Sequence, residues 1–406
     1  MPVGGPSQSL IDVKELIEKF SISELNEAAE EYWQRLVSNP KLLAKPFNLG
    51  EAEHILPQMG FLIQGLRLLV GMTILDFGAG SCHASRILNQ LGLRVISVDV
   101  SKTALEIGKG LAQRWPPVGD VPEQVFCHFD GQRLDLPDES VDRIFCLDAF
   151  HHVPDQRATL REMARVLKDG GIAGFAEPGP NHSKSSESQL EMRTCKVIEN
   201  DIVLGEVLSN GRAVGFTDLK VAVSTIHPPL VSLDKIAGYW AQPDAFVQGV
   251  QDRATNFPIF FLYKGDGGRD RTVPDSRAAA GLRGVIRARS TSVSSRAGQP
   301  VTLVFDVENT SPKTWLASGA KPGCVNLGAF LHRQSGEAHL GRSKEYRTML
   351  SAAGVEPGGA VTGVELDLGA LEAGEYLLEV DLVSEHICWF QSQDQSATTV
   401  RITVVS

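Results

Sequence analysis

The chain has 406 residues, of which 42% are hydrophobic and 22% charged, as is ordinary for a soluble protein of two or three domains. The formal net charge of −10 argues against nucleic acid as the main partner, because phosphate binding needs an excess of Lys and Arg. No signal peptide is evident, and no stretch supplies the roughly 20 apolar residues of a membrane span. The six cysteines form no CxxC pair, so a cytoplasmic location is expected.

Residues 1–60 are predicted to form an N-terminal helical cap. Apolar residues recur at helical spacing in 13–20 and again in 25–36. Ser21 is followed three residues later by Glu24, which is the spacing of a capping box, so the second helix is expected to begin there. Both helices are amphipathic, and the next domain is the expected partner for their apolar faces.

Residues 61–265 alternate short apolar runs with helical patterns. The runs expected to be strands are 73–77, 94–99, 124–130, 143–148 and 172–177, and the helical patterns are 84–91, 102–114 and 157–167. Apolar strands separated by helices indicate a parallel sheet covered on both faces, which is a doubly wound, Rossmann-like α/β domain. Two later runs, 219–223 and 258–263, are expected to complete this sheet.

The composition changes after residue 265. Residues 266–285 are rich in Gly, Arg and Asp and lack periodicity, as expected of a linker. Residues 286–406 show strand-like runs at 301–307, 325–331, 361–368, 376–383 and 398–405. Several short strands separated by Gly-containing turns predict an all-β antiparallel sandwich.

The run from Ile74 to Cys82 takes an apolar strand into a glycine turn that opens a helix. A second acid, Asp99, ends the next strand, where a ribose diol would be held. A dinucleotide site would instead need GxGxxG and a pyrophosphate on the helix N-terminus. Here Asp76 stands two residues before the first glycine, and the third glycine is missing. Since a carboxylate repels a pyrophosphate and attracts a cationic sulfonium, the pattern favours S-adenosyl-L-methionine over NAD.

The pattern resembles the class I S-adenosylmethionine-dependent methyltransferases, most closely the group that includes the ubiquinone- and menaquinone-biosynthesis enzymes. The resemblance spans about residues 60–178 and rests on the glycine turn, on Asp99, on Asp130-Gly131 after the third strand, and on the runs 134–153 and 160–171. It implies that Asp99 holds the ribose and that Asp130 faces the adenine. The cofactor-binding residues it implies are Asp76, Gly78, Ala79, Gly80, Asp99, Val100, Asp130, Gly131 and Asp148.

An oxygen acceptor would need a general base near the ends of strands four and five. The catalytic candidates are His151, His152, Glu177 and His182, although packing and helix capping are the ordinary alternatives for each. Asp148, Glu177 and His182 have side chains that can hold a metal in principle, but their spacing is not diagnostic and no metal is expected. The acceptor pocket is expected to be closed by the N-terminal helices and by residues 182–205 and 226–256.

The C-terminal region is similar to the Ig-like domains of bacterial polysaccharide-modifying proteins, although it lacks a cysteine pair at immunoglobulin spacing. Trp315 and Trp389-Phe390 are candidates for a sugar-stacking surface, with core packing as the alternative. The main functional hypothesis is therefore O-methylation of a saccharide or glycan-linked acceptor. The alternatives are methylation of a lipid, quinone or other small molecule, with the sandwich serving as a homodimer contact, and a non-catalytic adaptor with a vestigial cofactor fold.

Overall fold

The computed structural model describes residues 9–119, 121–223, 230–241, 244–265, 275–279, 281–319, 322–334, 344–393 and 396–406. The chain divides into two compact units, residues 1–68 with 72–270 and residues 69–71 with 271–406. Of the predicted linker, residues 266–274 and 280 lie outside the described residues. Ser276 and Leu282 are fully buried, so the described remainder of that segment is part of the second unit. No helix in the described ranges combines the length and apolarity needed to cross a bilayer.

The first unit is built on a seven-stranded sheet in the order β3-β2-β1-β4-β5-β7-β6. β1 pairs in parallel with β2 and β4, while β7 runs antiparallel to both of its neighbours. The expected Rossmann-like fold is thus confirmed, and the carboxyl ends of the parallel strands meet at one edge. The strands are β1 (Thr73–Phe77), β2 (Arg94–Asp99), β3 (Val125–His128), β4 (Val141–Leu147), β5 (Leu167–Ala176), β6 (Phe216–Val221) and β7 (Ile259–Lys264).

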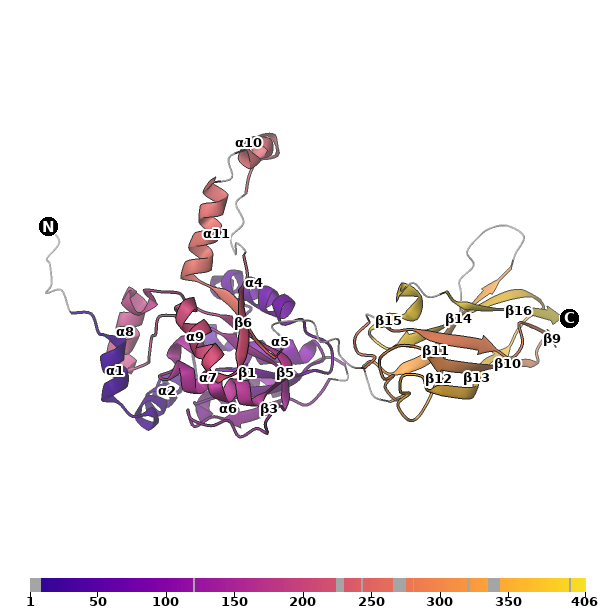
Figure 1. The fold of residues 1–406 in the computed structure, drawn as a ribbon, viewed down its shortest axis with the longest axis horizontal. Helices are drawn as coiled ribbons and strands as arrows, with labels where there is room; N and C mark the ends of the chain where they lie inside the picture. Colours follow the sequence, from indigo (N-terminus) through magenta and orange to yellow (C-terminus); the bar gives the residue numbers. More distant parts are fainter. Residues whose placement is uncertain are drawn as a thin grey trace. The chain divides into compact units, whose positions relative to one another are not determined.

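Helices cover this sheet and extend beyond it (Figure 1). α4 packs against β4, β5 and β7, and α6 packs against β2 and β3. α11 leads away from the sheet, and α10 lies at its far end. The helices and 3-10 turns are α1 (Val13–Lys19), α2 (Ile22–Leu36), α3 (Pro40–Leu43), α4 (Leu49–Gly65), α5 (His83–Gln90), α6 (Lys102–Arg114), η1 (Phe150–His152), α7 (Gln156–Val166), η2 (His182–Lys184), α8 (Ser186–Cys195), α9 (Leu204–Val214), η3 (Leu233–Lys235), α10 (Ile236–Trp240) and α11 (Asp244–Asn256).

Helix α2 is fixed over the edge of the sheet where β1 and β2 end. Its start is the predicted capping box, in which Ser21 and Glu24 bond each other's backbone N–H. Further along the helix, Glu30 accepts hydrogen bonds from the Ser101 hydroxyl at 2.6 Å and from the Thr103 N–H at 3.2 Å, at the start of α6. Burial alone would raise the pKa of Glu30, but these bonds lower it to about 2. This half-buried anion at a helix N-terminus ties α2 to α6.

The second unit is all-β. One sheet has the order β13-β10-β8, and the other has the order β12-β11-β14-β16-β9 with β15 on β14. All pairings are antiparallel except the parallel pair of β9 with β16. The strands are β8 (Gly284–Ala288), β9 (Ser292–Arg296), β10 (Pro300–Asn309), β11 (Val325–Arg333), β12 (Lys344–Met349), β13 (Ala360–Ala370), β14 (Gly374–Ser384), β15 (Cys388–Trp389) and β16 (Thr398–Val405), and a turn η4 (Phe390–Gln393) follows β15.

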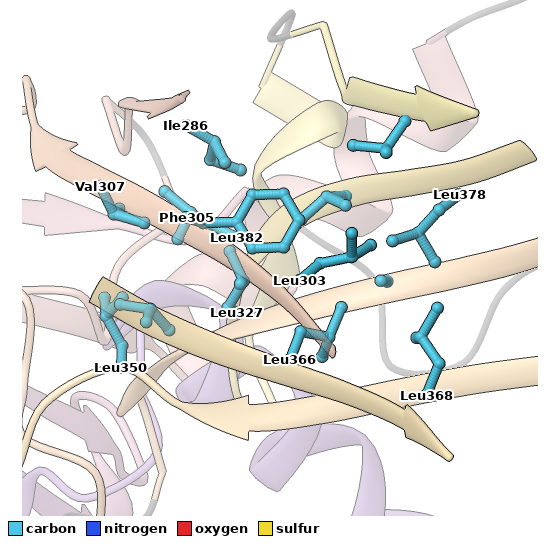
Figure 2. Packing of buried hydrophobic residues seen from close by; sticks show 14 of the residues in the cluster. Ile286, Leu303, Phe305, Val307, Leu327, Leu350, Leu366, Leu368, Leu378 and Leu382 are labelled. Carbon is cyan, nitrogen blue, oxygen red and sulfur yellow. The ribbon is translucent and has the colours of Figure 1, made fainter. Parts of the chain in front are cut away.

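The two sheets enclose a single apolar core, in which Phe305 of β10 and Leu366 of β13 lie among leucines of β11 and β14 (Figure 2). Trp315 and Phe390 are also fully buried and meet edge to face at 5.6 Å. Both were candidates for a sugar-stacking surface in the sequence. Neither ring presents a face to solvent, so both are core residues. All six cysteines of the chain are free.

Candidate functional site

Two adjoining cavities lie at the carboxyl edge of the sheet in the first unit. The small cavity has a volume of about 260 Å³ and the large cavity about 640 Å³. Both are lined by Trp33, Lys45, Gly78, Gly80 and Asp148, so they share a wall at the glycine turn. The large cavity is of the size class of a ligand site, and the small cavity is closed on one side by α2.

The glycine turn between β1 and α5 is tight for backbone and steric reasons. Gly78 and Gly80 have φ values of 67° and 52°, in the left-handed region that glycine tolerates best. A Cβ on Gly78 would lie 2.3 Å from the Cβ of Ala149, and one on Gly80 would lie 2.8 Å from the Trp33 ring. Cys82, which directly precedes α5, also has a positive φ of 57°.

Asp99 joins this turn to the next strand. It is 8% exposed and lines the small cavity together with Val100. Its carboxylate accepts hydrogen bonds from the N–H groups of Gly80 and Ser101, each at 2.8 Å. Burial raises the pKa of Asp99, and these two bonds oppose that rise. A carboxylate held this way at the end of the second strand suits a ribose diol.

Two other predicted cofactor acids lie outside the cavity walls. Asp76 is 2% exposed and accepts a hydrogen bond from the Ser85 hydroxyl, and burial together with the charge of Asp99 raises its pKa to about 7. The Asp130 carboxylate accepts from the N–H groups of Gln132 and Arg133 at 2.7 and 2.8 Å, so it closes a turn. These bonds also lower the pKa of Asp130. The structure therefore gives both acids local structural partners.

The remaining predicted cofactor residues border the cavities. Gly131 lines the small cavity, Ala79 the large one, and Asp148 both. The Ala79 N–H donates to the Val98 carbonyl at 2.9 Å, which ties the glycine turn to β2.

The polar groups around the glycine turn fit S-adenosylmethionine. The Ser81 hydroxyl lines the large cavity, and its oxygen is buried without a hydrogen-bond partner in the structure. Lys45 supplies a cation where the two cavities meet, and Asp99 supplies the acid in the small one. Orphaned buried polar groups are rare unless a ligand or water completes them. A hydroxyl, an ammonium and a carboxylate match the amino-acid end and the ribose of this cofactor.

All four predicted catalytic residues gather beside the cavities. His151 and His152 lie on η1, with ring centroids 3.9 Å apart, and His182 on η2 packs edge to face on His151 at 4.9 Å. Glu177 follows β5 and bonds Nδ1 of His151 at 2.7 Å. A fifth residue, Glu199, lies between α8 and α9 and accepts from Nε2 of His182 at 2.7 Å.

Glu177 is fixed by several hydrogen bonds from the residues of η1 and the residue before it. Its carboxylate accepts from the backbone N–H groups of Ala149, Phe150 and His151 at 3.1, 2.9 and 3.3 Å, as well as from the His151 ring. An anion is stabilised by such a set of N–H groups at the start of a helical turn. With these bonds made, Glu177 positions η1.

His182 is the histidine best placed to act as a base. It is 24% exposed and lines the large cavity, whereas His151 is buried and lines neither cavity. His152 lines the small cavity, and its Nδ1 lies 2.7 Å from the Ile198 carbonyl. Because a carboxylate only accepts hydrogen bonds, the bond to Glu199 places a proton on Nε2 of His182 and leaves Nδ1 as the acceptor of the neutral ring.

The structure does not bring Asp148, Glu177 and His182 together as a metal-binding cluster in the described part of the chain. The histidines and acid whose donor atoms converge there are instead His151, His152 and Glu199, within 4.8 Å of one another. The Nδ1 atom of His152 faces a carbonyl oxygen, so it carries a proton and has no lone pair for a cation. These three residues are better described as a hydrogen-bonded charge network.

This network predicts a pH-dependent stability. Burial alone would lower the pKa of His151, but the hydrogen bond and charge of Glu177 raise it to about 9. Since the folded-state pKa lies above the ordinary value near 6.5, the stabilisation is complete below pH 6.5 and is lost as the pH rises through 9. We expect the free energy of unfolding to fall by about 1–3 kcal/mol more across this window than in a His151→Gln variant. Denaturant titrations at pH 6, 7.5 and 9 check this, and parallel curves for the two proteins would contradict it.

Sequence reasoning missed several residues of the site. Glu199 lies in a loop without periodicity or motif, so only the path of the chain reveals its bond to His182. Asn26 of α2 lines the small cavity and donates to the Asp130 carbonyl at 2.8 Å. The amphipathic pattern of α2 predicted that it would pack on this domain, but it did not indicate which of its residues reach the cavity.

Comparison with known proteins agrees with this geometry. Residues 75–175 match the family model described as a methyltransferase domain. The chain therefore carries a class I methyltransferase domain, a fold whose cofactor is S-adenosylmethionine. The matched segment contains the glycine turn, Asp99 and η1.

Individual relatives match over part of their length. The chain is 33% identical over 113 residues to the uncharacterized methyltransferase YcgJ of Bacillus subtilis, covering 28% of this chain and 43% of that one. It is 32% identical over 108 residues to the 27-O-demethylrifamycin SV methyltransferase of Amycolatopsis mediterranei, covering 26% and 38%. It is 28% identical over 174 residues to a ubiquinone biosynthesis O-methyltransferase of Coxiella burnetii, covering 42% and 64%. In each case the match covers less than two thirds of the relative.

Proposed function

We propose that this protein transfers a methyl group from S-adenosylmethionine to a hydroxyl oxygen of a small-molecule acceptor. The observation that carries the proposal is that His182, bonded to Glu199, lines the same cavity as the glycine turn. A neutral imidazole oriented by a carboxylate is the arrangement that removes a proton from a hydroxyl. The methyltransferase domain supplies the cofactor fold around it.

Each residue has a stated role in this reaction. The cofactor supplies a methyl group already activated on a sulfonium. Asp99 holds the ribose, while Ser81 and Lys45 hold the amino-acid end against the glycine turn. His182 accepts the hydroxyl proton on Nδ1, and Glu199 stabilises the imidazolium that forms. Trp33 on α2 covers the turn and limits the access of water to it.

The proposed class of acceptor rests on the names of the matching proteins and not on the second unit. The names of two matching proteins specify methylation at oxygen, one in ubiquinone biosynthesis and one on a rifamycin. A saccharide acceptor was inferred from the second unit alone. Of the three aromatic residues considered for sugar stacking, Trp315 and Phe390 are buried, and the half-buried Trp389 is packed against Phe330 and Arg347. The adaptor alternative is disfavoured by the unpartnered Ser81 hydroxyl and by the assembled His182–Glu199 pair.

Two measurements on the full-length protein test the proposal. Calorimetry with S-adenosylhomocysteine is expected to show micromolar binding, and its absence would favour the adaptor. Transfer of a labelled methyl group is then compared across phenolic, lipid and saccharide acceptors. We expect base-stable, ether-linked label on a phenolic or other small hydroxyl compound. Label on saccharides alone would overturn the acceptor class while leaving the cofactor assignment intact.

A further inference from the structure

The cations that line the large cavity differ in their partners. Lys45 forms an ion pair with Glu51 at 3.6 Å and also borders the small cavity, which places it at the amino-acid end of the cofactor. Arg253, near the end of α11, lines the large cavity but not the small one. No acidic side chain pairs with Arg253 among the described residues, and its buried Nε has no hydrogen-bond partner.

The end of α11, which carries Arg253, lies against the loop that carries the proposed base. The end of α11 is tied to that loop by bonds from Gly179 N–H to Asn256 O at 2.7 Å and from Glu177 N–H to Pro258 O at 3.1 Å. A Cβ on Gly179 would lie 2.0 Å from the Thr255 carbonyl oxygen, so the two backbones are in direct contact. The guanidinium also lies over the Phe257 ring at 4.7 Å, which fixes its plane.

Two of the three acidic residues that line the large cavity have partners other than Arg253. Glu177 is engaged by backbone N–H groups and by His151, and Glu51 is paired with Lys45. Asp148, the third acid, is exposed at the glycine turn and lines both cavities, and no ion pair joins it to Arg253 in the described part of the chain. Burial without a counter-charge lowers the pKa of Arg253. A partly buried guanidinium without an anion is costly, and a bound anion would offset that cost.

We infer that the acceptor carries an anionic group, a carboxylate or a phosphate, which Arg253 binds while the acceptor hydroxyl reaches His182. This inference rests on the proposed methyl transfer. The planar guanidinium suits two-point binding of either group, and Phe257 and Ile259 supply the apolar wall for the body of the acceptor.

The test uses the full-length protein saturated with S-adenosylhomocysteine and three small probes that share a phenyl ring. Benzoate, phenyl phosphate and the neutral benzamide are titrated by calorimetry. We expect at least one of the two anions to bind about tenfold or more tightly than benzamide, and Arg253→Gln to weaken that anion by about tenfold or more. The stronger of the two anions identifies the group.

The control variant is Arg212→Gln, which removes an exposed cation on α9 away from both cavities. It is expected to leave anion binding unchanged. The inference is overturned if neither anion binds better than benzamide, or if Arg253→Gln binds the anion as the unaltered protein does. If the proposed function itself is wrong, the protein will not bind S-adenosylhomocysteine, and this is measured before the probes are added. Unchanged S-adenosylhomocysteine affinity in Arg253→Gln establishes that the variant is folded.

Discussion

Replacing His182 with Gln is expected to lower kcat for methyl transfer about 10²–10⁴-fold, the usual worth of a positioned general base. The Gln amide can still donate to Glu199, so the bond at 2.7 Å that fixes the loop is kept while proton acceptance is lost. His182 lines the large cavity, whereas the ribose acid Asp99 lines the small one, so the affinity for S-adenosylhomocysteine should change little. Steady-state kinetics and calorimetry on the same preparation measure both quantities.

Two further variants separate a base from a structural residue. Glu199→Gln should lower kcat less than His182→Gln and should shift the pH profile of kcat/KM, because the carboxylate acts through His182. His332→Gln alters another His–Glu pair, 3.3 Å apart in the second unit, and is expected to leave activity unchanged. Full activity in His182→Gln would show that the base lies elsewhere, with His152 the next candidate in the cavity walls.

The second large effect is expected at Asp99. Asp99→Asn should weaken binding of S-adenosylhomocysteine by about 1.5–3 kcal/mol, or roughly 10–150-fold, which is the worth of charge-assisted hydrogen bonds. Asn also places an amide NH₂ where the carboxylate now accepts from Gly80 and Ser101, so the glycine turn loses a tether. Calorimetry of the purified variant gives the affinity directly.

Asp130→Asn provides a matched control for Asp99. The same charge is removed from the end of the next strand, but this carboxylate bonds Gln132 and Arg133 and lies outside the cavity walls. We expect at most a small change in cofactor affinity. Equal losses in the two variants would mean that Asp130 faces the adenine, as the family resemblance implies, and that the cavity assignment is incomplete.

The sequence predicted the strands best where apolar runs had sharp ends. β1 and β2 have the expected bounds because each run stops at a polar or glycine-containing turn. β5 begins five residues earlier than the expected 172, because Leu167 leaves α7 directly in extended conformation and pairs with Val141 across a bulge. Hydrophobic periodicity does not report a strand that continues from a helix without a turn.

Site residues that directly follow a strand could be predicted from the sequence. Those that reach the site through the path of a loop could not. His182 and Glu177 were found because they follow β5 at the functional edge of the sheet. Glu199 and Arg253 come from segments without motif, and their roles arise from contacts with loops distant in sequence. For Asp76 the motif indicated more than the contacts support. Its place in the glycine motif suggested a ligand contact, but its carboxyl group accepts a hydrogen bond from Ser85 and lines neither cavity.

A crystal structure of the protein with S-adenosylhomocysteine tests most directly the claim that the glycine turn and Asp99 form the cofactor site. The ribose hydroxyls are expected within about 2.7–3.2 Å of the Asp99 carboxylate, with the amino-acid end beside Ser81 and Lys45. Ribose density remote from Asp99, or a nicotinamide dinucleotide retained in the same crevice, would contradict the account.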